Sequence, residues 1–267
     1  MFCCRRRKLR GSRIVVTGAS GGIGRALADE LARCGAKLVL NARSEDKLRD
    51  LATRLAAGGA EVEIAAGDVS DPTVRERILA AARDRFGGLD ILINNAGIGT
   101  FGRFVESDAD RLRRVMEVDF FAAVELTRMA VPLLRAGVKP AVVNVASILA
   151  HRGIPYGTEY CSAKFALRGF SEAVRPELNK LGIDLLLVSP GTTDTGFFDN
   201  VLKMDVELPW RKPGSSKGVT PEHVARAAAK AIERNTTEII PSLSGRLIVL
   251  ANRWMPRLVD RVLKRYG

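Results

Sequence analysis

Three side chains in the middle of the sequence have the types and spacing for acid–base chemistry on an oxygen atom. Tyr160 and Lys164 are four residues apart in a segment with helical spacing, so they share one face of a helix. A lysine one turn from a tyrosine lowers the pKa of the phenol electrostatically, which makes it a usable acid or base nearer neutral pH. Ser147 closes the preceding apolar run, and its hydroxyl can donate to a substrate oxygen that gains negative charge. The set predicts proton transfer on a carbonyl or alcohol oxygen.

A glycine-rich turn near the start of the chain has the composition of a phosphate-binding loop. Residues 17–24 read TGASGGIG and lie between an apolar run and a segment with helical spacing. The glycines allow a tight turn and a close approach of the backbone to a pyrophosphate, while the start of the next helix attracts the anion. We expect a dinucleotide to contact Gly18, Ser20, Gly22, Ile23 and Gly24.

The end of the second apolar run bears on which dinucleotide is bound. NAD-binding folds usually place an acidic residue here to hold the ribose 2′-hydroxyl, whereas this chain has Asn41, followed by Arg43 and Ser44. Without the carboxylate there is no repulsion toward a 2′-phosphate, and a guanidinium binds phosphate with paired, charge-assisted hydrogen bonds. The sequence therefore favours NADP(H) over NAD. The alternative is that Arg43 is a solvated residue at a helix start.

Apolar runs alternate with helical segments along most of the chain. The runs lack polar alternation, which is typical of strands covered on both faces, and their alternation with helices predicts a parallel sheet. We expect one α/β domain of the Rossmann-like type, a doubly wound parallel sheet in three α/β/α layers. The expected strands are residues 13–17, 37–41, 62–66, 89–94, 141–146, 183–188 and 238–241. The expected helices are residues 22–34, 44–57, 71–86, 108–135, 156–181 and 221–234.

Two further loops follow strands at their carboxyl ends, where ligands bind in such sheets. Asp68 and Val69 follow the third expected strand, and Asn95, Ala96 and Gly97 follow the fourth. These residues are candidates for cofactor contact. Position alone leaves it open that Asp68 only caps a turn.

With these motifs in place, residues 12–241 resemble the short-chain dehydrogenase/reductase (SDR) family, in its NADP-preferring type. The resemblance rests on TGASGGIG (17–24), NNAG (94–97), Ser147, YCSAK (160–164) and SPG (189–191), in that order, with the ARS triplet (42–44) pointing to NADP. It implies that Tyr160 transfers the proton, that Ser147 orients the carbonyl, and that Lys164 holds the nicotinamide ribose. It also implies that Asp68 and Val69 lie near the adenine and that Asn95 contacts the cofactor. Four more residues are implied to meet the nicotinamide or the phosphates: Pro190, Gly191, Thr193 and Thr195.

One position departs from the family pattern. Where the family usually has a Val-Asn pair, this chain has Val118-Asp119. The family residue helps to hold a water in a proton relay, largely through its backbone carbonyl, and Asp119 preserves that carbonyl. Its side chain also adds an acidic group near Lys164. We expect Asp119 to belong to the catalytic set, with activity retained and its pH dependence altered.

A long irregular segment, residues 192–218, interrupts the alternation and is expected to form a substrate lid. An apolar group near it suits a lipophilic ketone, a steroid-like molecule or an acyl substrate. The same residues would also serve simply to pack the lid on the core. They are Phe101, Ile148, Leu149, Tyr156, Phe197, Phe198, Leu202 and Met204. His151 follows Ser147 closely, and we expect it to be a solvated loop residue rather than a substrate contact.

The charge of the chain lies at its two ends. The net charge is +12; residues 1–13 contribute +6 and residues 244–267 contribute +5, so the middle is nearly neutral. The near-neutral middle and the absence of a basic groove with aromatic residues exclude nucleic acid as the expected partner. We therefore divide the chain into a basic tail (1–12), a catalytic domain (13–241) and a basic C-terminal helix (242–267).

The C-terminal helix is amphipathic, with Pro256 expected to kink it. Its apolar residues share one face, with the basic residues on the opposite side. The apolar residues are Leu247, Ala251, Trp254, Met255, Leu258 and Val262; the basic ones are Arg246, Arg253, Arg257, Arg261 and Lys264. Such a helix either lies in a membrane interface or packs on its own domain or a partner subunit.

The leading hypothesis is an NADP(H)-dependent oxidoreductase that moves a hydride between nicotinamide and a small carbonyl or alcohol substrate. The alternative is a non-catalytic, redox-sensing NADP(H)-binding protein, which Asp119 alone favours. The resemblance implies a homodimer or homotetramer built on the helices near 108–135 and 156–181. The four cysteines match no zinc spacing, so we expect no metal. A reducing cytoplasm is the expected location, with peripheral contact to a membrane surface as a variant of it.

Overall fold

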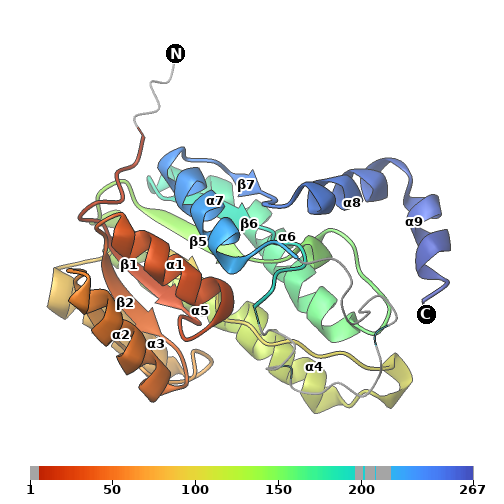
Figure 1. Ribbon diagram of the computed structural model, residues 1–267, viewed down its shortest axis with the longest axis horizontal. Coiled ribbons are helices and arrows are strands. Elements are labelled where there is room, and N and C mark those ends of the chain that lie inside the picture. The colour runs from red at the N-terminus through yellow and green to blue at the C-terminus, as the bar shows by residue number, and fades with distance from the viewer. Residues whose placement is uncertain (1–5, 196–200, 202–207, 209–217, 267) are drawn as a thin grey trace.

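A computed structural model describes residues 6–195, 201, 208 and 218–266 of the chain. Within these residues a single sheet of seven strands has the order β3-β2-β1-β4-β5-β6-β7, and every pairing is parallel. The sheet starts with β1 in its middle and grows outward in both directions, which is the doubly wound arrangement. The predicted fold class is confirmed (Figure 1).

The strands are short and buried. Their bounds are β1 Arg13–Thr17, β2 Lys37–Asn41, β3 Val62–Ile64, β4 Ile91–Asn94, β5 Ala141–Val145, β6 Asp184–Val188 and β7 Glu238–Ile239. Successive residues of a strand point to opposite faces, so β1 sends Ile14 and Val16 into one apolar core and Val15 into another. This explains why the strands carry continuous apolar runs.

Helices cover both faces of the sheet. α1 (Gly22–Arg33), α2 (Glu45–Ala57) and α7 (Pro221–Glu233) pack on the Ile14 side. α3 (Pro72–Phe86), α5 (Ala122–Arg135) and α6 (Thr158–Lys180) pack on the Val15 side. The resulting three layers place the loops that follow the strands along one edge of the sheet (Figure 1).

The long helix expected over 108–135 is present and contains a π-helical turn. It consists of α4 (Ala109–Met116), a π-helical turn (Glu117–Phe121) and α5. A π turn accommodates one extra residue in the helix and is frequent at functional sites. Asp119 lies in this turn and is buried.

Part of the predicted basic tail packs on the domain. Arg7 is buried, donates to the carbonyl oxygens of Lys139 (2.7 Å) and Ile232 (2.6 Å), and pairs with Asp184 at 2.7 Å. Leu9 is buried in the core beside α1. A buried arginine requires such hydrogen-bonding and charged partners, and here the domain supplies them. Residues 7–12 therefore belong to the folded unit.

The C-terminal segment forms two helices instead of one. α8 (Leu243–Trp254) ends before Pro256, which starts α9 (Pro256–Leu263) at its first position, where proline is favoured. Both helices project beyond β7 at one end of the molecule (Figure 1). In the described parts of the chain, no helix combines the length and apolarity needed to cross a membrane.

Candidate active site

The glycine-rich turn joins β1 to α1 and depends on glycine at specific positions. Gly18 and Gly22 have φ angles of +66° and +52°, in the left-handed region that glycine tolerates. A Cβ at Gly24 would lie 2.1 Å from the carbonyl oxygen of Gly18, so only glycine fits there. The turn therefore has the tight conformation that its sequence predicts.

The start of α1 is open to an anion. Its first turn carries no acidic residue, and Gly21 at the N-cap provides no side-chain hydrogen bond, so the first N–H groups of the helix are left for an external acceptor. Ser20 and Ile23 lie in the same turn and first helical residues, partly exposed. The glycine turn, which has no side chains at these positions, and the uncapped start of α1 together fit the pyrophosphate of a dinucleotide.

Asn95 and Ala96 fix this turn from the neighbouring strand β4. The backbone N–H groups of both residues donate to Oγ1 of Thr17, each at 3.0 Å. The side-chain amide of Asn95 donates to the carbonyl oxygens of Thr17 (2.9 Å) and Gly18 (3.3 Å). Asn95 thus acts on the glycine turn through direct hydrogen bonds, a contact that the motif alone did not reveal.

The loop after β2 presents the residues expected to select the cofactor. Asn41 is buried and donates to the carbonyl oxygens of Ala65 (2.8 Å) and Gly67 (3.1 Å), so it supports β3. Arg43 is exposed and has no ion pair or hydrogen bond with any other residue that the structure describes. Ser44 precedes α2 in the N-cap position, but its hydroxyl makes no capping bond. Both side chains are therefore available beside the glycine turn.

The Asp68 carboxylate has partners within the protein. It accepts from the backbone N–H (3.0 Å) and the hydroxyl (2.7 Å) of Ser70 and forms an ion pair with Arg114. Burial acts to raise the pKa of Asp68, but these bonds outweigh it, and the net pKa is lowered. The turn-capping role left open for Asp68 is therefore present. Val69 is buried in the core next to α3.

Ser147, Tyr160 and Lys164 lie together, as their spacing predicted. The side chain of Ser147 interacts with Tyr160, and the Lys164 ammonium lies 5.5 Å from the centre of the Tyr160 ring. All three side chains are buried. The hydroxyl of Ser147 also accepts from the N–H of Leu149 at 3.1 Å, which fixes its position.

Asp119 forms a buried ion pair with Lys164. Its Oδ2 atom lies 3.0 Å from the Lys164 ammonium, and the two side chains are 0% and 4% exposed. Its Oδ1 atom accepts from the N–H of Ile98 at 2.7 Å, which connects the loop after β4 to Lys164 through Asp119. A Cβ at Gly97 would lie 3.0 Å from Asp119 Oδ2, so the loop needs glycine to make room for the pair.

Burial dominates the acid–base properties of this group. It raises the pKa of Tyr160, and although Lys164 acts to lower that pKa, the charge of Asp119 adds to the increase. The expectation that the lysine lowers the phenol pKa is thus right for the pair but wrong for the net direction. Burial also raises the pKa of Asp119 despite Lys164; the pKa of Lys164 is raised because Asp119 and Tyr160 outweigh burial. At neutral pH the phenol carries its proton.

The segment after β6 comes back over the glycine turn. The carbonyl of Pro190 accepts from the N–H of Ile148 at 2.8 Å, so Pro190 and Gly191 lie beside the serine loop. Thr193 donates to the Gly191 carbonyl at 2.9 Å. A Cβ at Gly22 would lie 3.0 Å from Cβ of Thr195, which places Thr195 against the glycine turn. All four predicted residues thus lie at the same edge of the sheet.

The described part of the expected substrate-binding set is apolar and close to Tyr160. The rings of Phe101 and Tyr160 are 6.3 Å apart, and Phe101 is buried. The carbonyl of Tyr156 accepts from the N–H of Gly102 at 2.9 Å, which joins the two loops that flank the site. Four members of the set, Phe197, Phe198, Leu202 and Met204, lie outside the described residues, as does most of the expected lid.

The prediction for His151 is wrong. His151 is buried, and its Nε2 atom lies 3.0 Å from Oγ of Ser189 and 3.2 Å from Glu238. Its carbonyl accepts from Asn252 of α8 at 3.0 Å. Nothing near His151 in the sequence indicates this burial, because its partners lie 38, 87 and 101 residues further along the chain.

Comparison with known families agrees with this geometry. The short chain dehydrogenase family matches residues 12–205. An uncharacterized oxidoreductase, YxnA of Bacillus subtilis, is 32% identical over 97% of this chain and 73% of its own length. The ketoacyl reductase HetN of a Nostoc species is 30% identical over 97% of this chain and 90% of its own length.

Two solved structures share the fold. A short chain dehydrogenase/reductase from Burkholderia phymatum in complex with NAD has a TM-score of 0.86 and 26% identity, covering 94% of this chain and 96% of its own. An alcohol dehydrogenase from Thermococcus sibiricus complexed with 5-hydroxy-NADP has a TM-score of 0.77 and 28% identity, covering 86% of this chain and 96% of its own. The two carry different nicotinamide cofactors.

Proposed function

The chain belongs to the short chain dehydrogenase family and is an oxidoreductase of that type, and we propose that it uses NADP(H) to interconvert a lipophilic carbonyl compound and its alcohol. One observation carries the proposal: Ser147, Tyr160 and Lys164 form a connected group at the edge of the sheet where the glycine turn lies. A protein that only binds the cofactor has no need of this group.

Each of the three side chains has a distinct task in this proposal. Tyr160, whose raised pKa keeps it protonated at neutral pH, donates a proton to the carbonyl oxygen. Ser147 donates a hydrogen bond to the same oxygen as negative charge develops on it. The Lys164 ammonium stabilises the phenolate that proton transfer leaves behind. A protonated phenol favours the direction of carbonyl reduction.

The residues present fit a dinucleotide cofactor. The uncapped start of α1 and the turn of Gly18, Gly22 and Gly24 would hold its pyrophosphate, with Thr195 closing over the turn. Pro190 and Gly191 would lie beside the nicotinamide, and Lys164 would hold its ribose. When bound, the nicotinamide supplies the hydride that passes to or from the substrate carbon.

The preference for NADP(H) is supported by the loop after β2. Arg43 is exposed and has no hydrogen bond or ion pair with another described residue, so its guanidinium remains available for a 2′-phosphate, with the uncapped hydroxyl of Ser44 beside it. The buried Asn41 replaces the carboxylate that would repel that phosphate. We propose that Arg43 is the main determinant of cofactor choice.

The preference for a lipophilic substrate is supported by the apolar side chains next to the phenol. Phe101 packs near Tyr160, and Ile148 follows Ser147 directly. Similar proteins include a ketoacyl reductase and, at 38% identity over 70% of this chain, a hydroxysteroid 11-beta-dehydrogenase 1-like protein of Xenopus tropicalis. Both names refer to extended, largely apolar carbonyl compounds, and we propose this class for the present chain.

Replacing Tyr160 by Phe tests whether the protein is an enzyme. The change removes one oxygen, so reduction of an aliphatic or steroid-like ketone with NADPH should fall by a factor of about 10² to 10⁴ while NADPH binding is kept. Tyr266, far along the chain in the C-terminal segment, provides the matched control, since Tyr266→Phe should leave turnover unchanged. If a panel of ketones shows no turnover in the native chain while NADPH still binds, the non-catalytic alternative is correct.

Replacing Arg43 by Ala tests the cofactor. The native chain should bind NADPH more tightly than NADH by nicotinamide fluorescence, and the variant should lose about tenfold or more in NADPH affinity with NADH affinity unchanged. Arg49→Ala, which changes an exposed arginine of α2, is the matched control and should bind as the native chain does. Equal binding of both cofactors by the native chain would contradict the role of Arg43.

We propose in addition that the chain forms a homodimer or homotetramer through α4, α5 and α6. Three apolar side chains on these helices and on the π turn between α4 and α5 are exposed: Leu112, Phe121 and Phe165. Burial of such side chains against their copies is the usual way in which helices assemble subunits. Light scattering should give a multiple of the 29.0 kDa chain mass, which Phe121→Glu should reduce.

A further inference from the structure

The helix α8 presents its apolar side away from the domain. Four apolar residues recur at intervals of four, three and four, which places them along one side of the helix. We call them the outward face: Leu243, Leu247, Leu250 and Trp254, with exposures of 72%, 58%, 51% and 75%. An amphipathic surface helix usually buries this side, so α8 has the reverse orientation.

The inner side of α8 is small and polar, and it contacts the loop after Ser147. A Cβ at Gly245 would lie 3.0 Å from Ile148 Cγ2, so the backbone of the helix approaches this loop closely. Asn252 donates to the carbonyl of His151 at 3.0 Å and accepts from Arg152 at 3.1 Å. These contacts fix the orientation of α8. The outward face is therefore exposed although the helix is held on the domain by specific hydrogen bonds.

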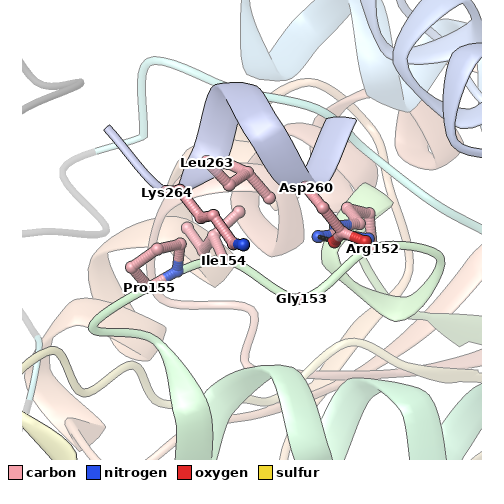
Figure 2. Close-up of a pocket in the computed structure, with 7 residues that line it drawn as sticks. All are labelled: Arg152, Gly153, Ile154, Pro155, Asp260, Leu263 and Lys264. Atoms are coloured by element: carbon pink, nitrogen blue, oxygen red, sulfur yellow. Dashed lines mark hydrogen bonds and ion pairs between the residues drawn. The ribbon is translucent and has the colours of Figure 1, made fainter. Parts of the chain in front are cut away.

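The helix α9 also contacts the loop with one side and exposes apolar residues on the other. Asp260 pairs with Arg152 at 2.5 Å on the inner side, while Met255, Leu258 and Val262 are exposed at intervals of three and four. A cavity of about 580 Å³ lies between α9 and loop residues 152–155, with Leu263 and Lys264 pointing from the helix toward that loop (Figure 2). The C-terminal helices and the active-site loop therefore form one continuous region.

Positive charge surrounds the exposed apolar residues. Residues 244–267 have a net charge of +5, and their only acidic residue, Asp260, is paired with Arg152. Arg246 and Arg253 follow one border of the outward face, and the guanidinium of Arg253 lies 6.0 Å from the ring centre of Trp254. A second copy of the chain would bring the same positive charge to this face, whereas an anionic surface would complement it.

We propose that α8 and α9 bind the surface of an anionic lipid bilayer through the outward face. The leucines enter the boundary between headgroups and acyl chains, Trp254 lies at the level of the headgroups, and the arginines bind lipid phosphates. Because the inner side of α8 contacts Ile148, α8 lies between the bilayer and the active-site loop. The proposal concerns lipid binding alone and does not depend on the proposed function.

Vesicle sedimentation with the full chain tests this inference without substrate or cofactor. The native chain should sediment with phosphatidylcholine vesicles that contain phosphatidylglycerol, much less with phosphatidylcholine alone, and less again at high salt. The double variant Leu247→Glu/Trp254→Glu should bind at least about tenfold more weakly. Val138→Glu changes an equally exposed valine (72%) between α5 and β5 and should sediment as the native chain does.

Two results would overturn the inference. One is the absence of sedimentation with anionic vesicles, or sedimentation that the double variant leaves unchanged. The other is a solution mass that falls in the double variant while no vesicle binding is seen, which would assign the outward face to a second copy of the chain. Urea unfolding of both variants shows whether each is folded under the conditions of the assay.

Discussion

The catalytic centre and the C-terminal helices break the usual rule of protein surfaces in opposite ways. At the centre, the charges of Asp119 and Lys164 are almost completely removed from water. On α8, Leu247 and Trp254 are more than half exposed to it. Neither arrangement favours the folded state, because buried charges lose hydration and exposed apolar side chains gain nothing from burial.

The buried charges and the exposed apolar side chains lie close to each other in the fold rather than at unrelated places. They lie on either side of one loop: Ser147 and Tyr160 on its inner side, Gly245 and Asn252 of α8 on its outer side. In most of the described fold, apolar side chains fill the two cores and an ion pair keeps at least one partner in contact with water; Arg111 and Glu159, the residue before Tyr160, form a second buried pair. Buried charges and exposed apolar side chains are departures from the usual pattern that are expected at functional sites. Experiments on these two regions therefore test function most directly.

The largest expected effect on stability is at Asp119. Replacing Asp119 by Ala leaves the Lys164 ammonium buried without a partner and should lower the free energy of unfolding by about 3–5 kcal/mol. Asp119→Asn keeps an acceptor for the N–H of Ile98 and should cost less. Equilibrium unfolding in urea measures both.

Asp260→Ala is the matched control for this prediction. It breaks the ion pair with Arg152, whose acidic side chain is 54% exposed, and such pairs contribute at most about 1 kcal/mol. If Asp119→Ala and Asp260→Ala prove equally mild, the catalytic centre tolerates an unpaired buried charge, and the contrast between the two regions fails.

Much of the fold and of the site could be predicted because the signals are local. Apolar runs predicted the strands, and the glycine turn predicted the start of α1. The helix expected over 71–86 is present as α3, where Asp71 accepts from the N–H of Thr73 and Pro72 takes the first position. Tyr160 and Lys164 could be paired because helical spacing places them on one face. In each case a few adjacent residues determine the outcome.

What could not be predicted depends on contacts between distant segments. The π turn at Asp119 adds one residue to a helix without changing its composition. The partners of His151 and Arg7 belong to other elements, so nothing near them in the sequence marks them as buried. Amphipathicity predicted α8, but which side faces the domain depends on Gly245 and Asn252 meeting the active-site loop.

A smaller effect is expected on the titration of Tyr160. The charge of Asp119 adds to the raised pKa of Tyr160, so Asp119→Asn removes that contribution and should lower this pKa, with phenolate appearing at lower pH. Absorbance of the phenolate measures it, with Tyr160→Phe as the reference that identifies the signal. Alcohol oxidation, which needs the phenolate as a base, should then rise at lower pH as well.

Asp68→Asn serves as the control for the titration. Asp68 is a partly buried carboxylate of the same sheet edge, but its partners are Ser70 and Arg114. The phenolate titration of this variant should match that of the native chain. A Tyr160 pKa that stays unchanged or rises in Asp119→Asn would show that the carboxylate does not act on the phenol through its charge.

The smallest expected effect on stability is at the outward face. It distinguishes a role of these residues in folding from a role in binding a partner. Leu247→Ser and Trp254→Ser should each change the free energy of unfolding by no more than about 0.5 kcal/mol, because these side chains are already exposed. Leu126→Ala in α5, at a position with 0% exposure, should cost about 2–5 kcal/mol in the same urea experiment. A loss comparable to that of Leu126→Ala would mean that α8 packs its apolar side on protein, which removes the contrast with the catalytic centre. Unchanged stability together with lost vesicle binding would mean that these residues serve an external surface and contribute nothing to the fold.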